Sequence, residues 1–186
     1  MIFDCFGVLV REGWFAFLDE FFAHDADKHQ KAVDGMSRMG SGLIGHDEFI
    51  AYLADLAGTN YQHVEDMLTD NPPDEKLFNY IENDLASKYK LAILSNAGAD
   101  RTIALFGAKR AALFDDVVLS YQFGMVKPKP EIYRITAERL GCQPSECLFV
   151  DDQERYCEGA ESVGMQTVHH VDPETTITMI KGLLSA

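Results

Sequence analysis

The chain opens with Met1-Ile2-Phe3-Asp4-Cys5-Phe6-Gly7-Val8-Leu9-Val10, and this stretch decides its fold. An apolar run that ends in one carboxylate, with a glycine soon after it, is typical of a short buried strand that breaks into a turn. Asp4 would then lie at the carboxyl end of the strand, where open α/β sheets bind their ligands. Such a pattern also arises by chance, so its weight depends on later segments that reach the same sheet edge.

The composition is that of a globular protein with one ordinary domain and room for a modest insertion. The sequence has 186 residues, of which 47% are hydrophobic and 25% are charged. Asp and Glu number 30 against 16 Lys and Arg, which gives a formal net charge of -14. Because such a surface repels nucleic acid and anionic lipid, we expect no nucleic-acid and no membrane partner. An anionic substrate would need cations supplied within its site.

The cysteine pattern favours a cytoplasmic protein. The four cysteines form no CxxC pair and no regular framework, which is typical of reduced thiols. No apolar run approaches the roughly 20 residues of a membrane span, and no basic and then apolar leader precedes the first strand. Because the chain opens almost directly into that strand, we expect a residue or two of the native N-terminus to be missing. The sequence leaves the oligomeric state open.

Residues 11–70 carry helical periodicity and no strand signal. Apolar residues recur at helical spacing over about 11–24, 25–39, 46–57 and 61–68, and Asn71-Pro72-Pro73 then ends the block. We therefore expect an all-helical domain over residues 11–70, inserted after the first strand. Residues 1–10 and 71–186 would form the core domain. An insertion at this place lies over the carboxyl edge of the sheet and is positioned to act as a lid.

Helices and strands alternate after the prolines. Short apolar runs predict strands at 91–94, 117–119, 147–150 and 165–168. Helical patterns are expected at about 77–85, 101–106, 130–141 and 173–184, with a further helix between the last two strands. Strands separated by helices imply a parallel sheet with right-handed crossovers. The fold class is therefore α/β, with a sheet of about five strands.

Polar residues stand at or shortly after the ends of four predicted strands. They are Asp4, Ser95-Asn96, Lys127 and Asp151-Asp152. Carboxylates gathered at one sheet edge repel each other unless a cation lies among them, and Mg²⁺ suits a site of few carboxylates, a backbone carbonyl and waters. A hydroxyl and a lysine opposite the metal would hold an anion. An aspartate beside such a metal can attack a phosphorus centre and form a covalent intermediate.

Four segments, in this order, resemble the motifs of the haloacid dehalogenase-like (HAD) superfamily, in the branch whose helical cap follows the first motif. The segments are Phe3-Asp4-Cys5-Phe6-Gly7-Val8-Leu9, Ala92-Ile93-Leu94-Ser95-Asn96, Phe123-Gly124-Met125-Val126-Lys127-Pro128-Lys129-Pro130-Glu131-Ile132-Tyr133, and Leu148-Phe149-Val150-Asp151-Asp152 with Gly159-Ala160 and Gly164 after it. The resemblance spans essentially the whole chain. It implies a parallel, Rossmann-like three-layer sandwich with an inserted all-helical cap domain.

The resemblance also implies which residues handle the substrate. Asp4 would be the nucleophile, and Ser95, with Asn96 beside it, would donate a hydrogen bond to the transferring group. Lys127 would pair with the substrate oxyanion and with Asp4. Gly7 would permit the turn after the nucleophile, whose backbone N–H groups can contact phosphate. The implied partner is a small anionic, phosphorylated substrate.

The metal site implied by the resemblance holds Mg²⁺. Asp152 would be a direct ligand, together with Asp4 and the backbone carbonyl of Phe6. Asp151 would be a further ligand or a partner of the ligands. The paired acids at 151 and 152 would repel each other beside Asp4 without a bound cation, so they favour a metal-dependent protein.

Phe6 departs from the pattern of the superfamily's phosphatases. These usually have a second Asp at that place, which protonates the leaving oxygen and later activates water. The superfamily's L-2-haloacid dehalogenases have an aromatic residue there, but they typically lack the paired acids of the fourth motif and work without metal. Since Asp151-Asp152 is intact, phosphate chemistry is favoured over dehalogenation.

Three functions remain to be separated. The first is a Mg²⁺-dependent phosphatase of a small metabolite, with slow turnover or a bias toward good leaving groups. Another proton carrier could come from Glu12, His24 or His46, although each is more simply explained as a residue of a solvated helix face or loop. The second is a non-catalytic or regulatory binding protein that keeps the fold, and the third is a 2-haloacid dehalogenase.

Overall fold

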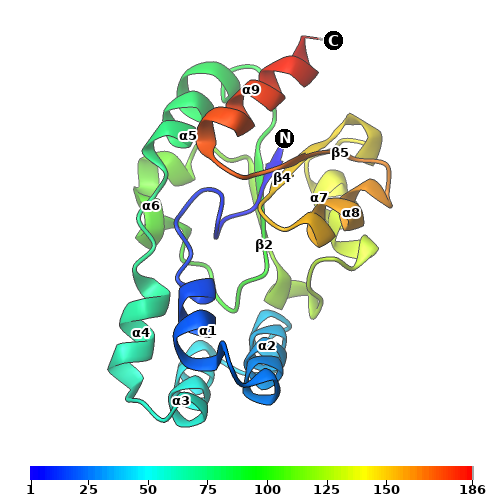
Figure 1. The fold of residues 1–186 in the computed structure, drawn as a ribbon. Coiled ribbons are helices and arrows are strands. Elements are labelled where there is room, and N and C mark those ends of the chain that lie inside the picture. Colours follow the sequence, from blue (N-terminus) through cyan, green and yellow to red (C-terminus); the bar gives the residue numbers. More distant parts are fainter. Residues whose placement is uncertain (186) are drawn as a thin grey trace.

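The sheet at the centre of the fold is parallel throughout. The structure is a computed structural model that describes residues 1–185. Within these residues, five strands pair in the order β3-β2-β1-β4-β5; Figure 1 labels β2, β4 and β5 of this sheet. They are β1 (Ile2–Phe3), β2 (Ala92–Ser95), β3 (Asp116–Leu119), β4 (Leu148–Asp151) and β5 (Gln166–His169). The short β1 is the central strand, because it pairs with both β2 and β4. The α/β class with about five parallel strands is confirmed.

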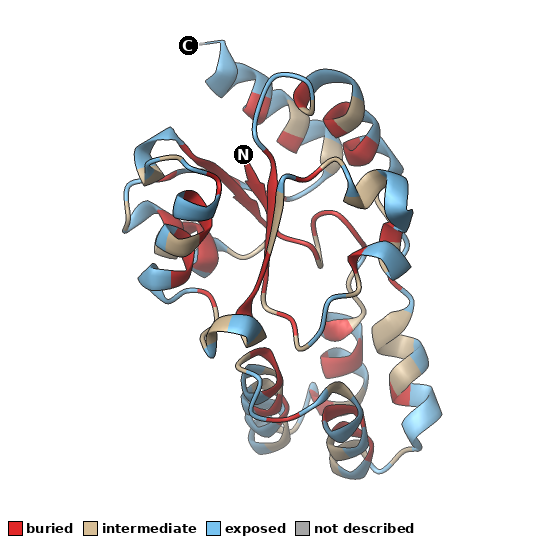
Figure 2. Ribbon diagram, turned by 180° about the vertical axis from the view of Figure 1, so that it is seen from behind, coloured by how far each residue is buried: buried red, intermediate tan, exposed pale blue. Residues whose placement is uncertain are grey.

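Helices cover both faces of this sheet. Successive side chains of a strand point to opposite faces, and accordingly Phe3 joins one apolar cluster and Ile2 another. The first cluster packs against α5 (Glu75–Tyr80), α6 (Thr102–Ala111) and α9 (Pro173–Leu184), and the second against α7 (Pro130–Arg139) and α8 (Glu154–Glu161). Figure 2 shows the buried strands between these two layers. The expected three-layer sandwich is therefore confirmed.

The helices between β1 and α5 form a separate group at one end of the sheet (Figure 1). They are α1 (Trp14–Phe22), α2 (Ala26–Gly40), α3 (His46–Ala57) and α4 (Tyr61–Thr69). Their apolar faces meet in a cluster of their own, in which the rings of Trp14 and Phe17 stack with centroids 6.1 Å apart. The longest, α2, has 15 residues, and no helix among the described residues is long and apolar enough to cross a membrane. The expected inserted helical cap is present, whereas its division from the core as a separate domain over residues 11–70 stays a prediction.

The two chain segments that join this helical group to the sheet lie side by side. The N–H of Arg11 donates to the carbonyl of Pro72 at 3.0 Å, and the N–H of Asp74 donates to the carbonyl of Leu9 at 2.9 Å. The side chain of Asn71 donates to the carbonyl of Arg11 at 2.8 Å. The chain therefore leaves and re-enters the core at one place.

Three helices differ from the sequence-based expectation. The first begins at Trp14 and not at residue 11, because the backbone of Arg11 is hydrogen-bonded to Pro72 and Asn71. Gly13, just before the helix, lies against α4: a Cβ there would be 1.9 Å from the carbonyl oxygen of Met67. The helix expected to end near residue 106 continues to Ala111 across a break at Gly107, whose φ is 80°. The helix expected over 77–85 changes to π-helical geometry at Ile81–Leu85.

Candidate active site

Asp4 is fixed at the edge of the sheet by the backbone on both sides of it. Its N–H donates to the carbonyl of Val150 at 2.9 Å, and only 5% of the residue is exposed. The following turn requires Gly7, whose φ of 87° favours glycine. A Cβ on Gly7 would also lie 2.6 Å from Oδ2 of Asp152. The N–H of Gly7 donates to the carbonyl of Val10 at 2.8 Å, and its expected contact with phosphate stays a prediction.

Lys127 connects the first and fourth motifs. Its Nζ lies 2.8 Å from Oδ1 of Asp4 and 2.6 Å from Oδ2 of Asp151, and all three residues are buried. Burial alone would lower the pKa of Lys127, but the two carboxylates outweigh it and hold the pKa above its usual value. Lys127 therefore stays charged and is a cation that the acidic chain supplies at this edge.

Asn96 holds the backbone of Lys127. Its Oδ1 accepts from the N–H of Lys127 at 2.8 Å, and its Nδ2 donates to the carbonyl of the same residue at 3.3 Å. Nδ2 also lies 3.3 Å from the hydroxyl of Tyr156. The side chain lines the cleft above Asp4, but these bonds make it a positioning residue. Its expected contact with phosphate stays a prediction.

Three carboxylates meet beside Lys127. Asp4, Asp151 and Asp152 each offer one oxygen atom, and these atoms lie within 4.8 Å of one another. Burial raises the pKa of Asp4 well above its usual value, and the charge of Lys127 opposes the shift. Burial and the charge of Asp151 raise the pKa of Asp152 to about 6. Both shifts express the cost of gathering negative charge in a poorly hydrated place.

The hydrogen bonds separate the roles of the paired acids. Both oxygens of Asp151 are used, since Oδ2 binds Lys127 and Oδ1 accepts from the N–H of Gln153 at 2.8 Å. In contrast, the buried Oδ1 of Asp152 has no hydrogen-bond partner within residues 1–185. A buried carboxylate oxygen without a donor, beside two more carboxylates, fits a hard divalent cation such as Mg²⁺.

Ser95 is the other unpaired group at the sheet edge. It ends β2 and is 1% exposed, and its Oγ has no partner among the described residues. Leaving a buried hydroxyl without a partner costs about 1–3 kcal/mol. An anion that accepts from Ser95 would remove that cost, so the hydroxyl is placed for binding a ligand.

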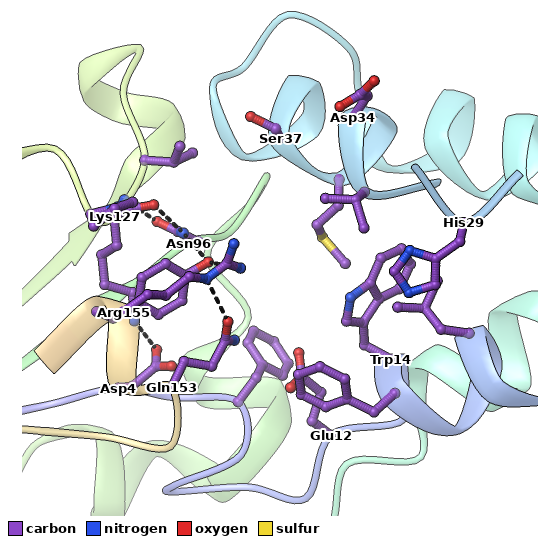
Figure 3. Close-up of a pocket in the computed structure, with 18 of the residues that line it drawn as sticks. Asp4, Glu12, Trp14, His29, Asp34, Ser37, Asn96, Lys127, Gln153 and Arg155 are labelled. Carbon is purple, nitrogen blue, oxygen red and sulfur yellow. Dashed lines mark hydrogen bonds and ion pairs between the residues drawn. The ribbon is translucent and has the colours of Figure 1, made fainter. Parts of the chain in front are cut away.

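A cleft of about 940 Å³ opens above these residues. Its floor includes Asp4, Ser95 and Lys127, and its other wall comes from α1 and α2, as Figure 3 shows for Trp14, Asp34 and Ser37. Sequence reasoning did not single out Arg155, which lines the cleft and donates to the hydroxyl of Tyr156 at 2.9 Å. The available signal was a basic residue three positions after Asp152 in an acidic chain.

Of the three suggested proton carriers, one lies in this cleft. Glu12 lines it together with Asp4 and Phe6, and its Oε2 is buried without a partner in the described part of the chain. Burial, followed by the charge of Asp152, raises the pKa of Glu12 to about 7. His24 is exposed and is not among the lining residues. His46 lines a smaller neighbouring cavity and lies 3.0 Å from a carboxylate oxygen of Glu65.

Comparison with known proteins gives one family for this arrangement. The family model described as haloacid dehalogenase-like hydrolase matches residues 1–164. The structure of a predicted HAD-like family hydrolase from Porphyromonas gingivalis superposes with a TM-score of 0.76 at 26% identity, over 100% of this chain and 97% of that one. An HAD family enzyme from Bacteroides thetaiotaomicron, in complex with magnesium and inorganic phosphate, gives a TM-score of 0.67 at 26% identity, over 90% and 91% of the two chains.

Curated relatives include phosphatases and a dehalogenase. D-ribitol-5-phosphate phosphatase of Bacteroides thetaiotaomicron is 28% identical over 150 residues, which is 75% of this chain and 71% of that protein. Phosphatase MT3486 of Mycobacterium tuberculosis is 49% identical over 59 residues, 30% of this chain and 27% of that protein. (S)-2-haloacid dehalogenase 4A of Burkholderia cepacia is 35% identical over 82 residues, which is 43% of this chain and 35% of that protein. Other relatives are matched over 7% to 24% of their own length.

Proposed function

Because the chain belongs to the haloacid dehalogenase-like hydrolases, we propose that it is a Mg²⁺-dependent phosphatase of a small phosphorylated metabolite. The observation that carries the proposal is the unpaired, buried Oδ1 of Asp152 within the cluster of three carboxylates. Such an oxygen is expected in a metal-dependent site and has no use in a metal-free dehalogenase. The relative named for D-ribitol 5-phosphate and the neighbour that holds magnesium and phosphate support the same choice.

Asp4 would be the nucleophile of this reaction. Its Oδ1 is held by Lys127 at 2.8 Å and by the N–H of Cys5 at 2.7 Å, which leaves Oδ2 to attack phosphorus. As the bond from Oδ2 to phosphorus forms, the bond from phosphorus to the leaving oxygen breaks, and that oxygen takes up a proton. Water then attacks the aspartyl-phosphate, which releases inorganic phosphate and restores the carboxylate of Asp4.

Ser95 and Lys127 would bind the phosphoryl group between these steps. The unpaired hydroxyl of Ser95 would donate to a phosphoryl oxygen, and Lys127 would offset its negative charge. Asp4, Asp152 and the carbonyl of Phe6 would hold Mg²⁺, with Asp151 fixed against Lys127. When bound, Mg²⁺ supplies positive charge to the phosphoryl oxygens.

The helical group α1–α4 would act as the cap of this site. Its helices α1 and α2 line the cleft opposite Asp4, so groups on this wall would contact the part of the substrate beyond the phosphate. We therefore propose that residues 11–70 form the cap domain and that residues 1–10 and 71–186 form the core domain. Closure over the substrate would exclude water from Asp4.

Phosphate release with and without Mg²⁺ tests the proposal. A set of phosphorylated metabolites and p-nitrophenyl phosphate would be offered to the wild-type protein and to Asp4→Asn. We expect release by the wild type that needs Mg²⁺, disappears in EDTA and is absent in Asp4→Asn. Equal release in EDTA would overturn the metal-dependent mechanism. Halide release from 2-chloropropionate in EDTA would identify a dehalogenase instead.

A non-catalytic binding protein is the second candidate, and Phe6 favours it. Its ring lines the cleft but cannot transfer a proton. A binding protein of this kind would be stabilised by Mg²⁺ and phosphate in thermal unfolding, yet would release no phosphate from any ester in the set. Release from even one ester, lost in Asp4→Asn, would remove this candidate.

A further inference from the structure

Glu12 is anchored on both sides in the segment between the turn at Gly7 and α1. Before it, the N–H of Arg11 donates to Pro72 and its carbonyl accepts from Asn71. After it, Gly13 packs so closely on the carbonyl of Met67 that no larger residue fits. The position of Glu12 relative to Asp4 is therefore set by backbone contacts, and Figure 3 shows its carboxyl group directed into the cleft.

The carboxyl group of Glu12 has no structural partner. Its Oε2 is buried and makes no hydrogen bond within residues 1–185. The two cationic groups in the same cleft are engaged elsewhere: Lys127 is paired with two aspartates, and Arg155 binds Tyr156 and Gln153. An unpaired buried carboxyl group is costly, so a purely solvated or structural role does not explain it.

Glu12 and Phe6 occupy the same surroundings. Both line the main cleft with Asp4, and both also line the smaller cavity beside it. The other acids that α1 and α2 contribute to the cleft wall, Asp19 and Asp34, are exposed. Besides Asp4, Glu12 is thus the shielded acid of the cleft, and it lines the same two cavities as Phe6.

We propose that Glu12 is the proton-transfer residue of this protein, in the role that Phe6 cannot fill; this inference rests on the proposed phosphatase function. The carboxyl proton of Glu12 passes to the leaving oxygen as the bond from phosphorus to that oxygen breaks. The resulting carboxylate accepts a proton from the water that attacks the aspartyl-phosphate. That step releases phosphate, frees Asp4 and returns Glu12 to its protonated form, so the cycle balances.

The test compares two substrates that differ in their need for an acid. 2,4-Dinitrophenyl phosphate has a leaving group that departs without a proton, whereas the leaving group of phenyl phosphate needs one. For Glu12→Gln we expect kcat/KM with phenyl phosphate to fall by about 10²- to 10⁴-fold. With 2,4-dinitrophenyl phosphate we expect kcat/KM to stay within a few-fold of the wild type, and a burst of dinitrophenol to precede a slower steady state. Retained activity on this substrate also shows that the variant is folded.

Two further variants complete the test. Glu12→Asp keeps a carboxyl group and is expected to regain part of the phenyl phosphate activity that Glu12→Gln loses. Asp19→Asn removes an exposed acid of the same cleft and is expected to keep the wild-type ratio between the two substrates. An equal fall for both substrates in Glu12→Gln, or no fall for either, would overturn the proposal. If the wild type releases phosphate from neither substrate with Mg²⁺, the phosphatase function itself fails.

Discussion

Lys127 carries the charge balance of the candidate site. Its ammonium group lies within 2.8 Å of Asp4 and 2.6 Å of Asp151, and none of its side chain is exposed. Removal of one member of a buried ion pair leaves an uncompensated charge, which commonly costs about 3–5 kcal/mol. The lysine is therefore expected to be required for folding as well as for chemistry.

We predict that Lys127→Met lowers the free energy of unfolding by about 3–5 kcal/mol in urea titrations at pH 7. The matched control is Lys129→Met, two residues away and exposed, for which we expect a change within about 0.5 kcal/mol. A loss below about 1 kcal/mol in Lys127→Met would contradict the charge balance described for the site.

Lys127 stabilises the folded protein, whereas the ionised carboxylate of Asp152 destabilises it. Its pKa is raised from 3.8 to about 6 in the folded protein, so between these pH values the folded state binds more protons than the unfolded state. By linkage, this contribution lowers stability as the pH rises from 3.8 to about 6, and the cost is complete above about 6. The cost is the free energy that a bound cation would offset.

We predict that Asp152→Asn raises the free energy of unfolding at pH 7 in EDTA by roughly 1–3 kcal/mol. At pH 3 the difference from the wild type should vanish, since Asp152 is protonated there in both states. Urea titrations across this pH range provide the measurement, with Glu158→Gln, an exposed acid of α8, as the control. A less stable Asp152→Asn at pH 7 would show that the carboxylate has a structural partner.

At the scale of elements, the geometry of the cleft depends on the segment 11–13, where it joins α1. Gly13 is the N-cap of α1 and lies against the backbone of α4. A side chain at position 13 must push the segment 11–13, and Glu12 with it, away from α4.

We predict that Gly13→Ala lowers the free energy of unfolding by about 1–3 kcal/mol, because a Cβ 1.9 Å from a backbone oxygen cannot be accommodated without movement. Gly45→Ala is the control, since Gly45 is the N-cap of α3 and has open space around it; a change below about 1 kcal/mol is expected there. Equal effects of the two changes in thermal unfolding would refute the close contact with α4.

The elements and the central residues of the site could be predicted from the sequence. Strand runs and helical stripes are local patterns, and the carboxyl ends of parallel strands must meet at one edge, so Asp4, Ser95 and Lys127 could be grouped without coordinates. Two features could not be predicted: the hydrogen bonds from Asn96 to the backbone of Lys127, and the burial of Glu12. Both depend on distant segments that pack side by side. The start of α1 was wrong by three residues for the same reason.

At the scale of the whole molecule, the cleft lies between two separately packed groups. The apolar cluster of α1–α4 is distinct from the two clusters on the sheet, and the segments that connect the groups run through residues 9–13 and 71–74. A metal that binds at the sheet edge would therefore stabilise the core directly.

We predict that Mg²⁺ raises the free energy of unfolding of the wild type by about 2.7 kcal/mol at a concentration of 100 Kd. The rise should be absent in Asp152→Asn and retained in Glu158→Gln. Thermal unfolding at increasing MgCl₂ measures this. An equal rise in Asp152→Asn would mean that the ion binds elsewhere on this acidic protein.

The covalent intermediate tests the central claim most directly. The wild-type protein would be mixed with 2,4-dinitrophenyl phosphate and Mg²⁺, quenched in acid within one turnover and mapped by peptide mass spectrometry. We predict a phosphorylated N-terminal peptide with the modification on Asp4, and none in EDTA. Phosphate release by the wild type without a phosphorylated Asp4, or turnover by Asp4→Asn at the wild-type rate, would contradict the mechanism.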